Sequence, residues 1–293
     1  MNMFSRFFLI AALGIWSLPA AAAPNWSDVD RALGQPGQEQ AGGVHRYSFP
    51  RSDLKVQLDG VRIKPALALG SWAAFLPMGD QAMVMGDLVL THEEVNPVLS
   101  RVLAGGLSIT ALHNHLLRSS PGTVYMHVAG RGDAVTLAKA LRTALAVTKT
   151  PATAAASPRS PTAPLGFDGV AVEREMKAAG KRNGGVLQFS FARGEQVNEQ
   201  GMEIPAAMGL GTAINFQGTA GGKAAITGDF VLTAKEVDPV LRALRGGGVE
   251  VTALHNHMLN DQPRLFFMHF WAHADAISLA RTLRAALNRM NVR

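Results

Sequence analysis

Residues 252–259 read Thr252-Ala253-Leu254-His255-Asn256-His257-Met258-Leu259, and residues 110–117 carry a near-copy of that stretch. The two copies lie 142 positions apart, and a Met-His pair follows each at the same distance, at 126–127 and 268–269. When residues 86–145 are aligned without a gap on residues 228–287, 30 of the 60 positions are identical. Self-similarity over this length predicts a duplicated domain, because the repeats of solenoid proteins are much shorter.

The apolar pattern around the motif predicts both strands and helices in each copy. In the first copy, the motif strand is followed by a turn and a returning strand, and helices flank this pair. The expected elements are strands at 44–49, 54–58, 70–76, 81–90, 107–117 and 123–129, and helices at 91–103 and 133–147. We therefore expect an α+β fold of two homologous domains, each an antiparallel sheet with helices packed on one face. Two similar halves can pack face to face about a pseudo-twofold axis, which is a further hypothesis.

The N-terminus has the pattern of an export signal. Arg6 supplies a positive charge, residues 7–18 are apolar, and small residues at 20–23 offer cleavage sites. The apolar run is short for a membrane span. The expected organisation is then a signal peptide, a first repeat domain, a linker rich in alanine and proline, and a second repeat domain, at 1–22, 24–147, 148–166 and 167–293.

The amino-acid composition excludes several classes of protein and several kinds of site. Hydrophobic residues make up 47% of the 293 residues and charged residues 17%, which is enough apolar material for a sizeable core. The formal charge of +6 is spread thinly, so nucleic acid is not an expected partner. The chain has no cysteine, which excludes disulfides, thiolate metal sites and attachment of a lipid through an N-terminal cysteine. We expect a periplasmic or secreted protein that is not a lipoprotein and has no membrane span in its mature chain; its oligomeric state stays open.

The repeated histidines are the strongest candidates for a functional site. His255 and His257 are one residue apart, so a strand would direct both to one face. If the returning strand pairs after the turn at Pro263, His269 would lie opposite one of them. The first copy places His113, His115 and His127 in the same pattern, so the sequence predicts a three-histidine site in each repeat.

Three neutral imidazoles with one open position are typical of catalytic zinc sites. Zinc is the favoured divalent metal, and manganese, iron or copper would also accept such ligands. The carboxylates that could act as catalytic base, fourth ligand or supporting partner are Asp229 and Glu236, with their matches Asp87 and Glu94. These carboxylates could instead have purely structural roles. The aspartates could be turn residues, and the glutamates could be capping-box partners of a threonine.

Three interpretations of the histidines therefore stand side by side. They form a metal site, a metal-free polar pocket for an anionic or polyol ligand, or a hydrogen-bond network between strands. Six of the nine histidines fall in the matched triads, so the clustering is not an effect of composition. A groove with Trp72 or Trp271 at its rim would favour a binding module, whereas an open metal position beside a carboxylate would favour an enzyme.

The duplicated motif, with Phe267-Met268-His269-Phe270-Trp271-Ala272-His273 after its second copy, resembles the LppY/LpqO family of exported bacterial proteins. The resemblance covers nearly all of the expected mature chain. It implies an exported protein of two such domains and no particular reaction, because the family is treated as one of unknown function. The namesakes are lipoproteins, and this chain departs from them in having no cysteine.

The functional expectation has two forms. In the first, an exported envelope protein uses a divalent metal for hydrolase or lyase chemistry on a small polar substrate. In the second, a non-enzymatic module binds a small polar ligand or a cell-envelope component, and the histidines line its pocket or hold its structure.

Overall fold

The computed structural model describes residues 23–151 and 163–293. The expected signal peptide and the centre of the expected linker lie outside these residues. Each repeat contains one six-stranded antiparallel sheet. Because both repeats have such a sheet with helices packed on it, the α+β fold of two homologous domains is confirmed.

The first repeat has the strand order β1-β2-β5-β6-β8-β7. Its strands are β1 (Gln38–Gln40), β2 (Val44–Pro50), β5 (Gly70–Met78), β6 (Gln81–Thr91), β7 (Ser108–His113) and β8 (Thr123–Gly132). Its helices are α1 (Trp26–Leu33), α2 (Pro65–Ala68), α3 (His92–Ala104) and α4 (Ala134–Leu145). The segment 54–58, expected as one strand, contributes only β3 (Gln57–Leu58), which pairs with β4 (Val61–Arg62) outside the main sheet.

The second repeat has the strand order β15-β17-β14-β13-β10-β9. Its strands are β9 (Lys181–Asn183), β10 (Val186–Phe191), β13 (Thr212–Gly218), β14 (Lys223–Thr233), β15 (Glu250–His255) and β17 (Leu265–Asp275). Its helices are α5 (Gly169–Met176), α6 (Ala234–Gly246) and α7 (Ala276–Leu287). A small separate sheet joins β11 (Asn198–Glu199), β12 (Met202–Glu203) and β16 (Asp261–Gln262).

Local sequence signals explain where the helices begin. The capping box expected at Thr91 and Glu94 is present, and α6 begins with the same box. The side chains of Asp133 and Asp275 accept hydrogen bonds from backbone amides in the first turns of α4 and α7, at 2.8 Å in each case. These caps satisfy amides that a helix leaves without partners, and each contributes about 1 kcal/mol to stability.

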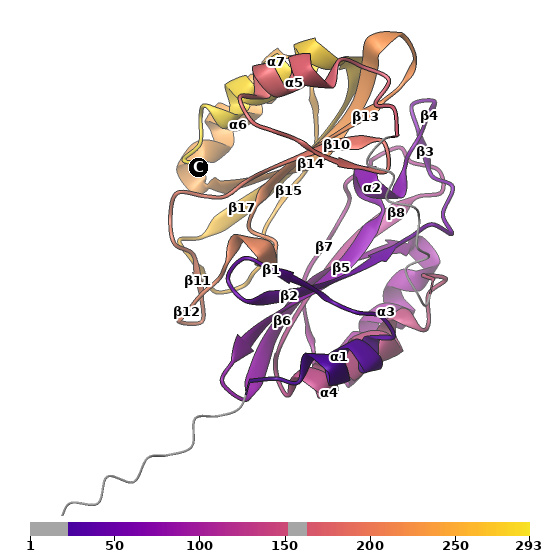
Figure 1. Ribbon diagram of the computed structural model, residues 1–293, viewed down its shortest axis with the longest axis vertical. Helices are drawn as coiled ribbons and strands as arrows, with labels where there is room; N and C mark the ends of the chain where they lie inside the picture. Colours follow the sequence, from indigo (N-terminus) through magenta and orange to yellow (C-terminus); the bar gives the residue numbers. More distant parts are fainter. Residues whose placement is uncertain (1–22, 152–162) are drawn as a thin grey trace, which may run out of the picture.

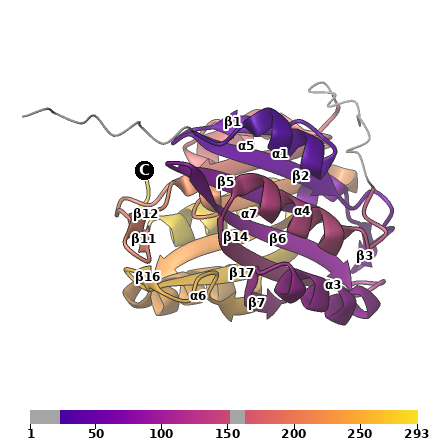
Figure 2. The ribbon, with the colours of Figure 1, turned by 90° about the horizontal axis from the view of Figure 1, so that it is seen from below.

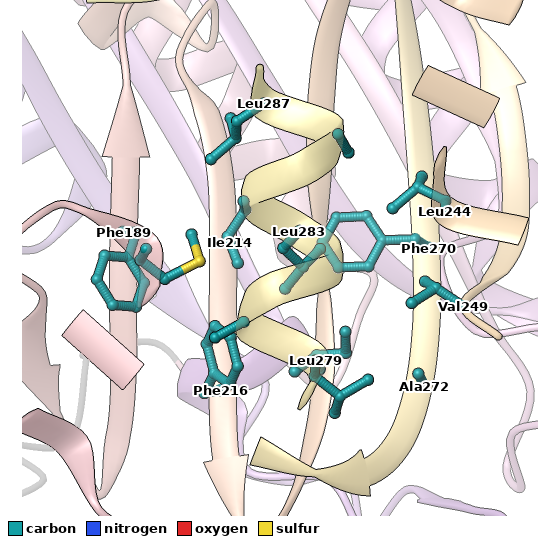
Figure 3. Packing of buried hydrophobic residues seen from close by; sticks show 14 of the residues in the cluster. Phe189, Ile214, Phe216, Leu244, Val249, Phe270, Ala272, Leu279, Leu283 and Leu287 are labelled. Atoms are coloured by element: carbon teal, nitrogen blue, oxygen red, sulfur yellow. The ribbon is translucent and has the colours of Figure 1, made fainter. Parts of the chain in front are cut away.

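Helices α1, α3 and α4 cover the outer face of the first sheet, α5, α6 and α7 cover that of the second, and the two sheets face one another across the middle of the molecule (Figure 1). The short helix α2 lies between the repeats, where Gln188 donates a hydrogen bond to the carbonyl oxygen of Ala66. The view from below shows the same layering (Figure 2). In the second repeat, Leu279, Leu283 and Leu287 of α7 pack on Phe216 and Phe270 of the sheet (Figure 3). Each fully buried leucine of this kind contributes about 1.5–3 kcal/mol.

The inner faces of the sheets bury a second set of side chains. Strand β6 sends Val84 and Leu88 toward the helices and Met85 and Val89 toward the other repeat. Both faces are buried, which explains why this strand reads as a continuous apolar run instead of an alternating one. The two hydrophobic clusters between the sheets contain residues of both repeats, so the halves form one four-layered body.

Candidate metal centre

The central strands bring a histidine and an aspartate together in each repeat. On β17, His269 lies opposite Asp229 of β14 and opposite Ala253 of β15. The first repeat places His127 opposite Asp87 in the same way. Directly opposite residues share a face of the sheet. These four polar side chains therefore all project toward the other repeat.

The His-X-His motif differs from the expected geometry. Strand β7 ends at His113, so His115 lies beyond the strand instead of within it, and β15 ends at the matching His255. The expectation that His269 lies opposite a motif histidine is wrong, because β15 and β17 pair with Ala253 opposite His269 and His255 opposite Phe267. The two motif histidines nevertheless converge in the first repeat, where the Nε2 atoms of His113 and His115 are 3.0 Å apart.

All six histidines form one cluster between the repeats, which we call the histidine cluster. Three pairs of rings, each with one ring from each repeat, connect the two halves. The ring centroids are 3.6 Å apart in the pair His113–His255, 3.7 Å in His127–His257 and 3.8 Å in His115–His269. The sequence led us to expect a separate site in each repeat. That expectation is corrected: the sheets pack with their histidines facing one another, so the two triads merge.

The cluster follows the pseudo-twofold symmetry of the chain. His115 stacks on Tyr125 with ring centroids 3.5 Å apart, and the matching His257 stacks on Phe267 at 3.4 Å. The pair formed by His127 and His257 has its counterpart in the pair formed by His269 and His115, and their distances differ by 0.1 Å (3.7 and 3.8 Å). The axis therefore passes through the cluster.

Four of the histidines present ligand atoms that lie within 4.8 Å of one another; they are His113, His255, His257 and His269. The Nδ1 atoms of His269 and His255 lie 3.0 Å from the carbonyl oxygen of Gly228 and 3.1 Å from that of Asn256. If each Nδ1 carries the proton, its Nε2 keeps a free lone pair. Both Nε2 atoms are buried and have no hydrogen-bond partner in the part of the chain that the structure describes. This is the tautomer that metal-binding histidines adopt.

Asp87 and Asp229 lie beside the cluster. A carboxylate oxygen of Asp87 is 3.9 Å from Nε2 of His127, and one of Asp229 is 3.8 Å from Nε2 of His257. These separations are too long for hydrogen bonds. Within residues 23–151 and 163–293, one oxygen of each aspartate is buried without a partner. Buried polar atoms normally have partners, so their concentration here indicates a site for a ligand.

Burial sets the protonation states of the cluster. It lowers the pKa of all six imidazoles, to about 4 for His255 and about 3 for His269, and in all of them except His255 the charges on neighbouring histidines oppose protonation further. Burial raises the pKa of Asp87 to about 8, against the opposing charge of Arg46, and it raises the pKa of Asp229 well above its usual range. At pH 7 the imidazoles are neutral, as metal ligands must be.

The structure does not bring Glu94 and Glu236 into this group. The carboxylate of Glu94 accepts hydrogen bonds from Arg51 at 2.7 and 3.2 Å and from the backbone amides of Thr91 and Lys149. Arg51 is fully buried, and its side chain has no exposed surface. In the second repeat, Glu236 accepts hydrogen bonds from Arg193 and from the amides of Thr233 and Asn291. These glutamates are therefore engaged in buried ion pairs at helix starts.

Sequence reasoning missed Arg46, which joins the repeats next to the cluster. Its guanidinium lies 3.9 Å above the ring of Trp72 and donates a hydrogen bond to the carbonyl oxygen of Ala207 in the second repeat. Its charge acts on Asp87. No signal in the sequence could have indicated this residue, because it lies in the part of the repeat where the two copies diverge.

Fold and site together define a duplicated α+β protein with a histidine-rich centre between its repeats. The chain belongs to the family described as Domain of Unknown Function (DUF1259), whose model matches residues 27–147 and again residues 170–289. No curated protein matches the chain in sequence. None of the helices within 23–151 and 163–293 has the length and apolar character needed to cross a membrane.

Three solved structures show a distant likeness, and two of them are described as shell proteins of bacterial microcompartments. The trimeric shell protein PduB is 12% identical, with 85% of this chain and 88% of that chain covered and a TM-score of 0.21. The double-ringed trimeric shell protein MSM0271 from the RMM microcompartment is 10% identical; the match covers 72% of this chain and 84% of that chain, with a TM-score of 0.20. EtuB from Clostridium kluyveri is 11% identical; the match covers 86% of this chain and 90% of that chain, with a TM-score of 0.19. Scores this low carry no argument about this chain.

Proposed function

We propose that the histidine cluster binds a divalent metal ion, with zinc favoured over manganese, iron or copper. The observation that carries this proposal is the convergence of four imidazole ligand atoms within 4.8 Å; three of these histidines have a buried Nε2 atom without a hydrogen-bond partner among the described residues. A hydrogen-bond network would give buried nitrogens partners, and these nitrogens have none in the described ranges. The residues fit a cation because neutral imidazoles supply lone pairs and two buried aspartates can supply compensating charge.

We further propose that the metal supports hydrolase or lyase chemistry on a small polar substrate. A bound divalent metal polarises an oxygen of the substrate or lowers the pKa of a bound water molecule. The chain's own contribution would come from Asp87 and Asp229. They lie beside the histidine cluster, and either carboxyl could act as general acid or base toward a substrate bound there within hydrogen-bond reach. Glu94 and Glu236 would stabilise the repeats instead.

The alternative is a non-enzymatic module that binds a small polar ligand or an envelope component. It is favoured by the partial exposure of His113, His115 and His255, which leaves the cluster accessible. Trp271, which was expected to form an aromatic rim at such a groove, does not lie at an exposed edge. Trp271 is only 2% exposed, and its indole donates a hydrogen bond to Asp59.

The cellular location is also a proposal. The N-terminal pattern and the resemblance to the LppY/LpqO family support export and cleavage after Ala22, which would leave a periplasmic or secreted chain. Cell fractionation and the mass of the mature protein would test this. A full-length mass from a cytoplasmic fraction would contradict it.

Metal analysis of protein purified without an affinity tag tests the metal site. We expect near-stoichiometric metal in the wild type and its loss in His257→Ala. If metal is absent, and stays absent after incubation with zinc, manganese, iron and copper salts, the metal proposal is wrong. If metal is present, screening with ester, phosphoester and lyase substrates separates an enzyme from a binding module.

A further inference from the structure

A second feature lies between the repeats, next to the histidine cluster. It is a pocket of about 230 Å³, and we call it the methionine pocket because Met83, Met85 and Met258 line it. Met258 directly follows His257 in the chain and is 1% exposed. Six of the chain's twelve methionines belong to the surrounding hydrophobic cluster. Thioether sulfur is therefore concentrated in one part of the molecule.

Strand register places the pocket beside the cluster. Met83, Met85 and Asp87 alternate along β6 and face the other repeat. Residues two apart on a strand are separated by about 7 Å. Met85 therefore lies one such step from Asp87, whose carboxylate oxygen is 3.9 Å from Nε2 of His127. The pocket and the cluster share one inner surface of the sheet.

The matching positions of the other repeat differ from this pocket in their side chains. The residues that match Met83, Met85 and Met258 contain no sulfur; they are Ala225, Thr227 and Leu116. Ala129 of the pocket wall is matched by Trp271, which is 2% exposed and packs in one hydrophobic cluster with Ala225 and Leu116. On that side the space is filled by an indole, whereas on this side it is open and lined by thioethers.

We propose that the methionine pocket binds Cu(I) through the sulfur atoms of Met83, Met85 and Met258. Soft thioether ligands select Cu(I), whereas hard divalent cations prefer oxygen. The chain has no cysteine, so methionine provides all of its sulfur ligands. Methionine also fills irregular gaps in cores, but a filler closes space, and these three side chains border an open pocket. The Cu(I) site does not depend on metal binding by the histidine cluster.

Titration with Cu(I) under anaerobic conditions, in competition with the chelator bicinchoninate, tests the proposal on the full chain. The variant is Met83→Leu/Met85→Leu/Met258→Leu, which keeps apolar side chains of similar volume and removes the sulfur. We expect the wild type to hold one equivalent of Cu(I) that this variant lacks, or holds at least tenfold more weakly. Zinc binding by the variant should be unchanged, because the histidines remain.

A matched control carries three Met→Leu changes outside the pocket, at the buried positions Met126, Met176 and Met268. It should bind Cu(I) like the wild type. Equal Cu(I) binding by the pocket variant and the wild type would overturn the proposal, and so would equal losses in the pocket variant and the control. If the pocket variant does not fold, X-ray absorption at the copper edge of the Cu(I)-loaded wild type decides. Sulfur neighbours support the site, and their absence overturns it.

Discussion

The imidazole rings of His113 and His255 stack with their centroids 3.6 Å apart, and one ring comes from each repeat. The two residues are exact matches in the duplicated sequence, 142 positions apart. Their contact therefore lies on the pseudo-twofold axis that relates the two sheets. It makes the candidate metal centre a property of the whole chain, because neither repeat holds it alone.

Removing either of these histidines should abolish tight metal binding by the whole chain. We expect His113→Ala and His255→Ala each to weaken zinc affinity at least tenfold, since each supplies a ligand to the same four-nitrogen group. Competition with a chromophoric zinc chelator measures this. His92→Ala, at an exposed position outside the cluster, is the control. Loss of only half of the bound metal in each variant would instead indicate two independent sites.

Metal binding at pH 7 should release protons from the aspartates. Burial raises the pKa of Asp87 to about 8, so this carboxyl is mainly protonated at pH 7, and a nearby cation favours its ionised form. The histidines are already neutral and have no proton to lose. The ionisation of Asp87 should therefore make affinity rise with pH up to about 8, and above that pH its contribution levels off.

Calorimetry in buffers of different ionisation enthalpy counts these protons. The count should fall between pH 7 and pH 9, where Asp87 ionises in the metal-free protein, and Asp87→Asn should lower it at pH 7. Proton release that is largest below pH 6 would mean that the imidazoles lose the protons, which contradicts the prediction.

The sequence predicted the fold well because the relevant signals are local. The capping aspartates Asp133 and Asp275 and the box at Thr91 determine where helices begin, and each acts within one turn. The duplication doubled every such signal. The strand of the His-X-His motif was predicted too long, because the backbone leaves the sheet at His113 although apolar residues continue.

The repeated pattern indicated all six histidines and the two aspartates that lie together, and it also indicated Glu94 and Glu236, which do not join them. Spacing within one repeat carries no information on which residues of the other repeat lie opposite it across the interface. The merging of the triads depends on packing between sheets, to which residues far apart in sequence contribute, such as Val44 and Val231. The same limit concealed the hydrogen bond that Arg46 donates to the carbonyl oxygen of Ala207 in the second repeat.

Glu94 should matter for stability and not for the metal. Glu94→Gln leaves Arg51 with a weaker partner in a fully buried position, and breaking a buried ion pair costs about 3–5 kcal/mol. Because Asp53 still pairs with Arg51, we expect a loss near the lower end of this range. Urea unfolding of the metal-free protein measures it, alongside zinc affinity. Unchanged stability together with lost zinc affinity would place Glu94 in the metal centre after all.

Gly228→Ala should damage the metal centre through the backbone. A Cβ atom at Gly228 would overlap the carbonyl oxygen of Ala213 on the neighbouring strand, so β14 would have to shift. The carbonyl oxygen of Gly228 lies 3.0 Å from Nδ1 of His269, and the shift would disturb the ring that this contact orients. We expect at least a tenfold loss of zinc affinity and a lower free energy of unfolding.

Gly246→Ala is the matched control for this change, because a Cβ atom at this last residue of α6 meets no atom within 4 Å among the described residues. Alanine is preferred over glycine in helices by about 0.5–1 kcal/mol, so this variant should keep its zinc affinity and be at least as stable as the wild type. If Gly228→Ala binds zinc as tightly as Gly246→Ala, the hydrogen bond to His269 does not orient a metal ligand. In that case Nε2 of His269 would have to be removed from the proposed ligand set.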